Sequence, residues 1–291
     1  MSDEVISCKE RLRRGSDPQA RSCVKQGDFA TVSKTERECA RESAAYNKLC
    51  VLPEYTDAKV VDLAVTTRYG ARHSLNSMDN VHKAFDAIKK IHEKGVIHGD
   101  LKPAHLRQYS ESKKVFFIDF GCSVDYPLAH NSGFTALYAS IDSLVMRTVH
   151  PLDDYEAVLV AALESISCLP TLPHQIAPPA EESLKKWLRW KMELMDTVYA
   201  THAQRNNPFL AFLLDKLLLV WAMPRSCGWI SDDNVVKLMS DQDHASAYLK
   251  SLQVELVRDF TAALGRAQPR ERDQPVHDFA LCRTRLKVSL C

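Results

Sequence analysis

The spacing of apolar residues along the first quarter of the chain predicts short strands around one helix. Residues 21–25 predict a short strand that turns Lys25 inward. Along residues 36–49, apolar side chains recur at intervals of three and four, which predicts an amphipathic helix. Residues 62–66 predict a second strand. This part of the chain is therefore expected to form a small mixed segment of strands and one helix.

A longer helix is predicted from residue 79, because five apolar residues share one helical face. They are Val81, Ala84, Phe85, Ile88 and Ile91. Ser77 or Asp79 can cap the start of this helix, and Gly95 suits the position just beyond its end. The helix thus leads the chain directly into residues 96–106.

Two extended apolar pieces then flank a polar turn. The first piece is residues 96–106 and contains Asp100, while the second is residues 115–121 and contains Asp119. Paired as a small hairpin, the two pieces place both carboxylates at one end of it.

The rest of the chain is predicted to be mainly helical. After Asp154 the run to residue 169 is nearly all apolar, so it predicts a helix buried on most sides. Residues 168–182 are rich in proline and predict a loop. Further helices are predicted over 184–200, over 208–222 and from 235 or 245 to 264. Residues 265–291, charged and punctuated by proline, predict a flexible tail.

Composition narrows the class of protein. A length of 291 residues allows one enzyme of two lobes or two small domains, and 45% hydrophobic residues is ordinary for a globular protein. A net charge of +1 gives no reason to expect nucleic acid or an acidic membrane surface as a partner. The most apolar run, residues 209–223, contains two charges and is too short to span a bilayer.

Cysteine usage and the first residues indicate a compartment. The nine cysteines are scattered and include no pair separated by two residues, which is typical of free thiols in a reducing environment. The sequence opens with an acidic stretch and no apolar signal region. We therefore expect a cytoplasmic protein, or a nuclear one.

The two carboxylates of the hairpin have the chemistry that phosphoryl transfer needs. One carboxylate, Asp100, could orient a hydroxyl nucleophile, and the other, Asp119, could hold a metal on the phosphates. Lys102, two residues after Asp100, could neutralise charge that develops on the transferred group.

These residues stand in motifs that resemble those of the eukaryotic protein kinases. The stretch from His98 to Lys102, His-Gly-Asp-Leu-Lys, is similar to their catalytic loop, and Asp119-Phe-Gly121 is similar to their metal-binding motif. The residues 133–142 and 150–156 most resemble the casein kinase one group and fungal kinase-like families. The resemblance implies an α+β fold of two lobes, with a reduced β-rich N-lobe over about 1–70 and a mainly helical C-lobe over about 71–264.

The same resemblance implies roles for further residues. Lys25 would bind the α- and β-phosphates and pair with Glu42, although an exposed lysine on an edge strand is the alternative. Thr135 would hydrogen-bond Asp100 and Lys102, and residues 67–70 would form the hinge beside adenine.

Asp154 has two compatible interpretations. In the kinase-like one it is a buried carboxylate that holds the backbone of the catalytic loop, and in the other it is an ordinary helix N-cap.

Three departures from the kinase pattern bear on activity. Gly99 replaces an arginine that would otherwise receive a phosphorylated activation loop. Only Gly15 lies where a glycine-rich loop is expected, which bears on nucleotide affinity. His105 replaces a metal-binding asparagine, and Mg²⁺ prefers oxygen ligands. For His105 three outcomes stay open: the second metal is lost, Mn²⁺ is preferred, or catalysis is lost.

The sequence leads to two main hypotheses. In the first, the chain is a serine/threonine protein kinase that uses ATP with Mg²⁺ or Mn²⁺, with Asp119 and His105 at the metal and a protein as substrate. In the second, it is a pseudokinase that serves as a binding or scaffold module for a protein partner. A small-molecule phosphotransferase is a third hypothesis, because the His-Gly-Asp triplet of this chain also occurs in such enzymes.

Overall fold

The structure is a computed structural model, and it describes the residues in the following ranges: 23–26, 28–125, 129–130, 133–146, 148–170, 172, 186–191, 193–195, 197–198 and 207–222. The chain divides into two compact units, Met1–Trp187 and Leu188–Cys291. The predicted helix that ends at residue 264 and the predicted tail 265–291 lie outside the described residues, as does Gly15.

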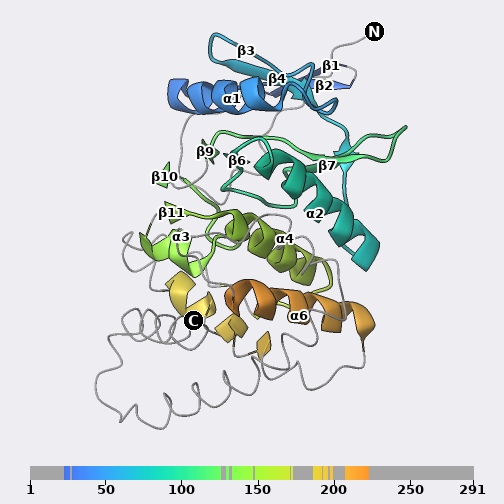
Figure 1. Ribbon diagram of the computed structural model, residues 1–291, viewed down its shortest axis with the longest axis vertical. Coiled ribbons are helices and arrows are strands. Elements are labelled where there is room, and N and C mark those ends of the chain that lie inside the picture. Colours follow the sequence, from blue (N-terminus) through green and yellow to red (C-terminus); the bar gives the residue numbers. More distant parts are fainter. Residues whose placement is uncertain are drawn as a thin grey trace. The chain divides into compact units, whose positions relative to one another are not determined.

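The described residues form an α+β arrangement of small antiparallel sheets and helices (Figure 1). Its largest sheet has the strand order β1-β2-β4-β3. The bounds of these strands are β1 Cys23–Gln26, β2 Phe29–Ser33, β3 Lys59–Val61 and β4 Ala64–Arg68. The predicted strand 62–66 is thus observed two residues later, because Asp62 adopts a positive φ of 52° in the turn before it. Strands β2 and β3 of this sheet were not predicted.

Helix α1, Glu36–Leu49, has the bounds predicted from its apolar spacing. Thr35 and Glu38 form a reciprocal capping box at its start, which satisfies backbone donors that a helix leaves free. The helix packs against β3 and β4 (Figure 1), and its residues Tyr46 and Leu49 are buried. The capping box therefore determines where β2 must stop and the helix begin.

Helix α2, Met78–His92, begins at the predicted cap, Ser77. Gly95 lies two residues beyond the helix C-cap, one position later than predicted, with a φ of +71° that glycine adopts at little cost. The buried face of α2 contacts β6, β8 and helix α4. Helix α4 spans Pro151–Ser165, and every residue from 151 to 163 is buried. The prediction of a helix buried on most sides is therefore confirmed, although it starts before Asp154 and ends before 169.

The remaining elements of this unit are short. β7 and β8 form the predicted hairpin, with Leu106 opposite Phe117, and β5 pairs with the other edge of β7. Two further strand pairs are β6 with β9 and β10 with β11. The bounds are β5 Ala71–Arg72, β6 Val96–Ile97, β7 Leu106–Gln108, β8 Val115–Phe117, β9 Val124–Asp125, β10 Ala129–His130, α3 Ile141–Met146 and β11 Thr148–Val149.

In the second unit, helix α6 spans Pro208–Ala222, as predicted. The described residues between 186 and 198 are helical as well, within the predicted helix 184–200. In the part of the chain that the structure describes, the helices are all too short or too polar to cross a membrane.

Candidate functional site

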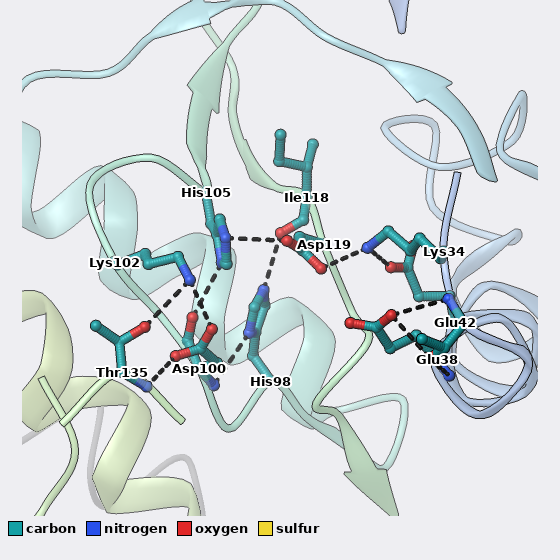
Figure 2. A network of polar contacts seen from close by, with 11 residues as sticks. Lys34, Glu38, Glu42, His98, Asp100, Lys102, His105, Ile118, Asp119 and Thr135 are labelled. Carbon is teal, nitrogen blue, oxygen red and sulfur yellow. Dashed lines mark hydrogen bonds and ion pairs between the residues drawn. The ribbon is translucent and has the colours of Figure 1, made fainter. Parts of the chain in front are cut away.

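Asp100 lies in the loop between β6 and β7, and its two carboxylate oxygens have separate donors. Lys102 Nζ donates to Oδ2 at 2.8 Å, and the backbone N–H of Thr135 donates to Oδ1 at 2.6 Å. Lys102 Nζ also donates to Thr135 Oγ1 at 3.1 Å. The three residues thus meet: the Thr135 backbone N–H donates to Asp100, and the Thr135 hydroxyl accepts from Lys102 (Figure 2).

The charge state of Asp100 follows from these donors. Burial raises the pKa of this carboxyl, but Lys102, His105 and the hydrogen bonds outweigh burial and lower the pKa below its usual range. Asp100 is therefore an ionised hydrogen-bond acceptor at neutral pH. Such a group aligns a hydroxyl well and removes a proton weakly.

Asp119 follows β8 and connects two parts of the site. Lys34 Nζ lies 2.5 Å from Oδ1, and His105 Nε2 lies 3.1 Å from Oδ2, so Asp119 stands between these two residues (Figure 2). Its φ of 70° is in the left-handed region, which aspartate tolerates better than most residues do. Burial raises the Asp119 pKa, but His105 and then Lys34 outweigh it and hold the pKa well below its usual range.

Lys34, not Lys25, is the lysine that pairs with Glu42, so the predicted Lys25–Glu42 pair is wrong. Lys34 directly follows β2, and its ammonium bonds Glu42 on α1 as well as Asp119. Lys25 lies opposite Ala30 in the β1–β2 ladder, and Ala30 is four residues before Lys34 in the sequence. Side chains leave a strand roughly perpendicular to it, so Lys25 is directed elsewhere, to the ring of Tyr69.

A signal for Lys34 was present in the sequence. Residues 29–33 read Phe-Ala-Thr-Val-Ser, rich in aromatic and β-branched types, and so favour a strand. The capping residues Thr35 and Glu38 follow directly and place the helix start just after Lys34. Together they would have put a lysine between a strand end and the helix that carries Glu42.

Glu42 and Lys34 are both buried, at 0% and 9% exposure. Burial raises the pKa of Glu42 to about 7, although Lys34 pulls it down. Burial would lower the Lys34 pKa, but Asp119 and Glu42 outweigh burial and raise it, so Lys34 keeps its proton. Oε2 of Glu42 is buried without a hydrogen-bond partner.

His105 is 5% exposed and contacts both halves of the site. Its Nδ1 lies 3.0 Å from the backbone oxygen of Asp100 and must carry the proton there, because a carbonyl can only accept. In the neutral ring, Nε2 then turns a lone pair toward Asp119, an arrangement that suits a shared cation. In the protonated ring, Nε2–H donates to Asp119 directly.

His98 links the backbone of the two motifs. Its Nε2 lies 3.1 Å from the carbonyl oxygen of Ile118, and its Nδ1 accepts the N–H of Asp100 at 3.4 Å. Burial, followed by the nearby His105, lowers the His98 pKa to about 4. The ring is neutral at physiological pH and has one defined tautomer.

Asp154, on helix α4, holds the backbone of the loop that carries Asp100. Its carboxylate accepts the backbone N–H of His98 at 2.9 Å and that of Gly99 at 3.0 Å, and His92 Nε2 lies 2.9 Å away. The N-cap of α4 is His150, paired with Asp153, so the N-cap interpretation of Asp154 is wrong. Gly99 has a φ of +77°, a conformation that glycine adopts far more readily than other residues.

The residues around Asp119 fit a cation that is completed by a substrate. Among the described residues, no three His, Cys, Asp or Glu side chains are grouped as a metal site. Mg²⁺ is usually held by one or two carboxylates together with substrate phosphates and water, so one carboxylate such as Asp119 is a sufficient protein contribution. The side chain of Asp119 is 35% exposed and accessible for that role. His105 Nε2 would add nitrogen, which Mn²⁺ accepts more readily than Mg²⁺.

No protein-family model matches this chain, and a search of curated proteins finds no significant match.

Proposed function

We propose that this chain has a bilobal protein-kinase-like fold and transfers the γ-phosphoryl group of a nucleoside triphosphate, ATP by the resemblance, to a serine or threonine hydroxyl of a protein. One observation carries the proposal, namely that two groups of side chains are linked by His105. Lys102 and Thr135 donate hydrogen bonds to Asp100, and Lys34 contacts Asp119. His105 contacts both the backbone oxygen of Asp100 and the carboxylate of Asp119. These are the parts that phosphoryl transfer requires, and they come from distant parts of the sequence.

Asp100 has the geometry to align the nucleophile. Its carboxylate is ionised and is held by Lys102 and Thr135, so it can accept a hydrogen bond from the attacking hydroxyl. The hydroxyl oxygen forms the new bond to the γ-phosphorus while the bond from that phosphorus to the β,γ-bridging oxygen breaks. The hydroxyl proton passes through Asp100 to solvent or product, and Lys102 stabilises the charge on the transferred group.

Lys34 is the phosphate-binding lysine in this proposal. Glu42 of α1 holds its ammonium in place, and the same ammonium contacts Asp119, the carboxylate proposed to bind the metal. A nucleotide would replace that contact with phosphate oxygens. A divalent cation, held by Asp119 and His105 when bound, would supply neutralisation of the β- and γ-phosphate charge.

A pseudokinase is the second candidate, and one observation favours it. Both carboxylate oxygens of Asp119 are already engaged, Oδ1 by Lys34 and Oδ2 by His105. A metal must displace or share these contacts, which weakens its binding. In this alternative the same fold binds a protein partner without turnover.

Kinetics on matched variants test the proposal. We expect Asp100→Asn to lower the rate of phosphate transfer to a generic protein substrate by about 100-fold or more, because general-base and alignment effects are typically of that size. Asp86→Asn, an exposed aspartate of α2, is the control and should leave the rate unchanged. If Asp100→Asn keeps the wild-type rate, phosphate transfer is assigned to the wrong residues.

Nucleotide binding by calorimetry tests whether Lys34 binds the phosphates. Lys34→Met should abolish detectable triphosphate binding, while Lys114→Met, at an exposed lysine of the β7–β8 turn, should bind as wild type does. Binding that is equal in all three proteins contradicts the role of Lys34. Binding without any turnover would support the pseudokinase alternative.

A further inference from the structure

A second polar cluster lies beside the site, and the proposed chemistry does not use it. It consists of Tyr69, Lys25 and Arg107, and we call it the Tyr69 cluster. Lys25 Nζ and Arg107 Cζ each lie 4.0 Å from the centre of the Tyr69 ring, and Arg107 Nη2 donates to Tyr69 Oη at 3.0 Å. The two cations come from β1 and β7, which belong to different sheets.

The Tyr69 cluster contains two cations, Lys25 and Arg107, and no carboxylate that would neutralise them. Arg107 is 5% exposed, and its Nε is buried without an acceptor. Among the described residues, neither Arg107 nor Lys25 has a carboxylate partner. A cation on a tyrosine ring gains only part of what burial of a guanidinium costs. The arrangement therefore favours a ligand that brings hydrogen-bond acceptors.

The backbone holds the Tyr69 cluster in a defined geometry. Gly70 follows Tyr69 with a φ of +54°, and a Cβ at this position would lie 2.8 Å from the backbone oxygen of Gln108. The segment after β4 thus runs against β7 so closely that only glycine fits. Tyr69 is thereby fixed next to Arg107, one residue before Gln108.

The position of the Tyr69 cluster relates it to the base of a bound nucleotide. Arg107 lies in β7 and follows His105 by two residues, and the His105 carbonyl extends the β7–β8 pairing by accepting the N–H of Ile118 at 3.0 Å. Side chains two residues apart on a paired, extended backbone leave the same face, about 7 Å apart. His105 contacts Asp119, where the phosphates are proposed to lie. A nucleotide that starts at Asp119 and runs along this face brings its base to Arg107 and Tyr69.

We propose that the Tyr69 cluster selects a guanine nucleotide over an adenine nucleotide, an inference that rests on the proposed function. Guanine presents two adjacent acceptors, O6 and N7, which are the groups that an arginine fork contacts most often. Adenine has an amino donor in place of O6, and this donor would face the N–H groups of Arg107. Arg107 has five N–H donors, of which one is used by Tyr69 Oη and the Nε donor has no acceptor.

Competition with a fluorescent nucleotide, on the full chain with Mg²⁺ or Mn²⁺, tests this inference. We expect GTP and inosine triphosphate to bind at least tenfold more tightly than ATP, because both present O6 and N7. We expect 7-deaza-GTP, which lacks the N7 acceptor, to bind about tenfold more weakly than GTP. Comparing these four ligands on the wild-type protein needs no variant to fold.

Variants of Arg107 assign the preference to this side chain. Arg107→Leu should remove the preference for GTP while ATP binding persists, and Arg107→Lys, which keeps the charge but not the fork, should remove it too. Arg72→Leu, at an exposed arginine of β5, is the matched control and should keep the wild-type preference.

The outcomes separate this inference from the proposed function. ATP binding as tight as or tighter than GTP binding overturns the guanine preference and leaves phosphoryl transfer intact. Inorganic tripolyphosphate that competes as well as GTP also overturns it, because the charge alone would then be recognised. If no triphosphate binds, the proposed function fails and the guanine preference fails with it.

Discussion

Asp119 and His105 make opposing demands on a metal at this site. Asp119 offers oxygen, which suits Mg²⁺, and His105 Nε2 offers nitrogen 3.1 Å away. Lys34 holds the other oxygen of Asp119, so each oxygen of this carboxylate already has a partner. If a metal binds here as proposed, the identity of residue 105 would decide which ion binds best.

We expect His105→Asn to raise the Mg²⁺-dependent rate by about tenfold, the lower end of what a changed metal environment typically produces. Asparagine supplies an oxygen in place of the ring nitrogen. The wild-type protein should be relatively better with Mn²⁺ than the variant is. Steady-state rates with each metal measure both effects. Inactivity with every metal, unrelieved by His105→Asn, would show that the chain is a pseudokinase.

Helix α4 supports the loop that carries Asp100, through the side chain of Asp154. The carboxylate of Asp154 accepts hydrogen bonds from the backbone N–H groups of His98 and Gly99, which lie in the loop after β6. His92 of α2 contacts the same carboxylate, so one residue joins two helices to the loop. The conformation of the loop thus depends on packing between α2 and α4.

We expect Asp154→Asn to lower the free energy of unfolding by about 2–4 kcal/mol, because a buried charged acceptor is lost and an amide N–H₂ then meets backbone donors. The rate of transfer should fall as the loop loosens. Urea denaturation measures the stability, and Asp86→Asn, at an exposed aspartate of α2, serves as the control. A loss below about 0.5 kcal/mol, the range of ordinary surface substitutions, would contradict the supporting role of Asp154.

Across the whole molecule, buried titratable groups make stability depend on pH in opposite directions. The His98 pKa is lowered from 6.5 to about 4, so the unfolded chain binds the proton first and stability is lost as pH falls through this window. The Glu42 pKa is raised from 4.5 to about 7, so its contribution to stability is lost as pH rises through that window. The two effects partly cancel between pH 4.5 and 6.5.

Comparison with His98→Asn isolates the histidine contribution. The difference in free energy of unfolding between wild type and variant should fall by about 3 kcal/mol from pH 7 to pH 4, since each unit of pKa shift corresponds to about 1.4 kcal/mol. Urea titrations at a series of pH values measure this difference. A difference that is constant with pH would mean that His98 takes up a proton as readily in the folded protein as in the unfolded chain.

Regulation of the whole molecule should not require a phosphorylated activation loop. Gly99 stands where an arginine would receive the phosphate, so we expect phosphatase treatment to leave the rate of transfer unchanged. Mass spectrometry before and after treatment identifies any phosphate removed. A large loss of rate, with phosphate found beforehand on Ser123, Ser132 or Thr135, would contradict this expectation.

Much of the fold could be predicted because its signals are local. The apolar spacing gave the bounds of α1, a continuous apolar run gave α6, and two apolar pieces on either side of a polar turn gave the β7–β8 hairpin. Asp100 and Lys102 meet because they are two residues apart in one turn. Helix caps and short turns depend on neighbouring residues, so the sequence by itself determines them.

The tertiary structure alone decided which side chains from distant segments meet. Lys34 rather than Lys25 reaches Glu42 and Asp119 because strand register and the start of α1 set its direction, and Asp119 lies 85 residues away. The Tyr69 cluster joins β7 to the end of β4 across 38 residues and left no periodic signal. Side-chain direction changes with every residue of register, so such contacts depend on how the strands pair rather than on local composition.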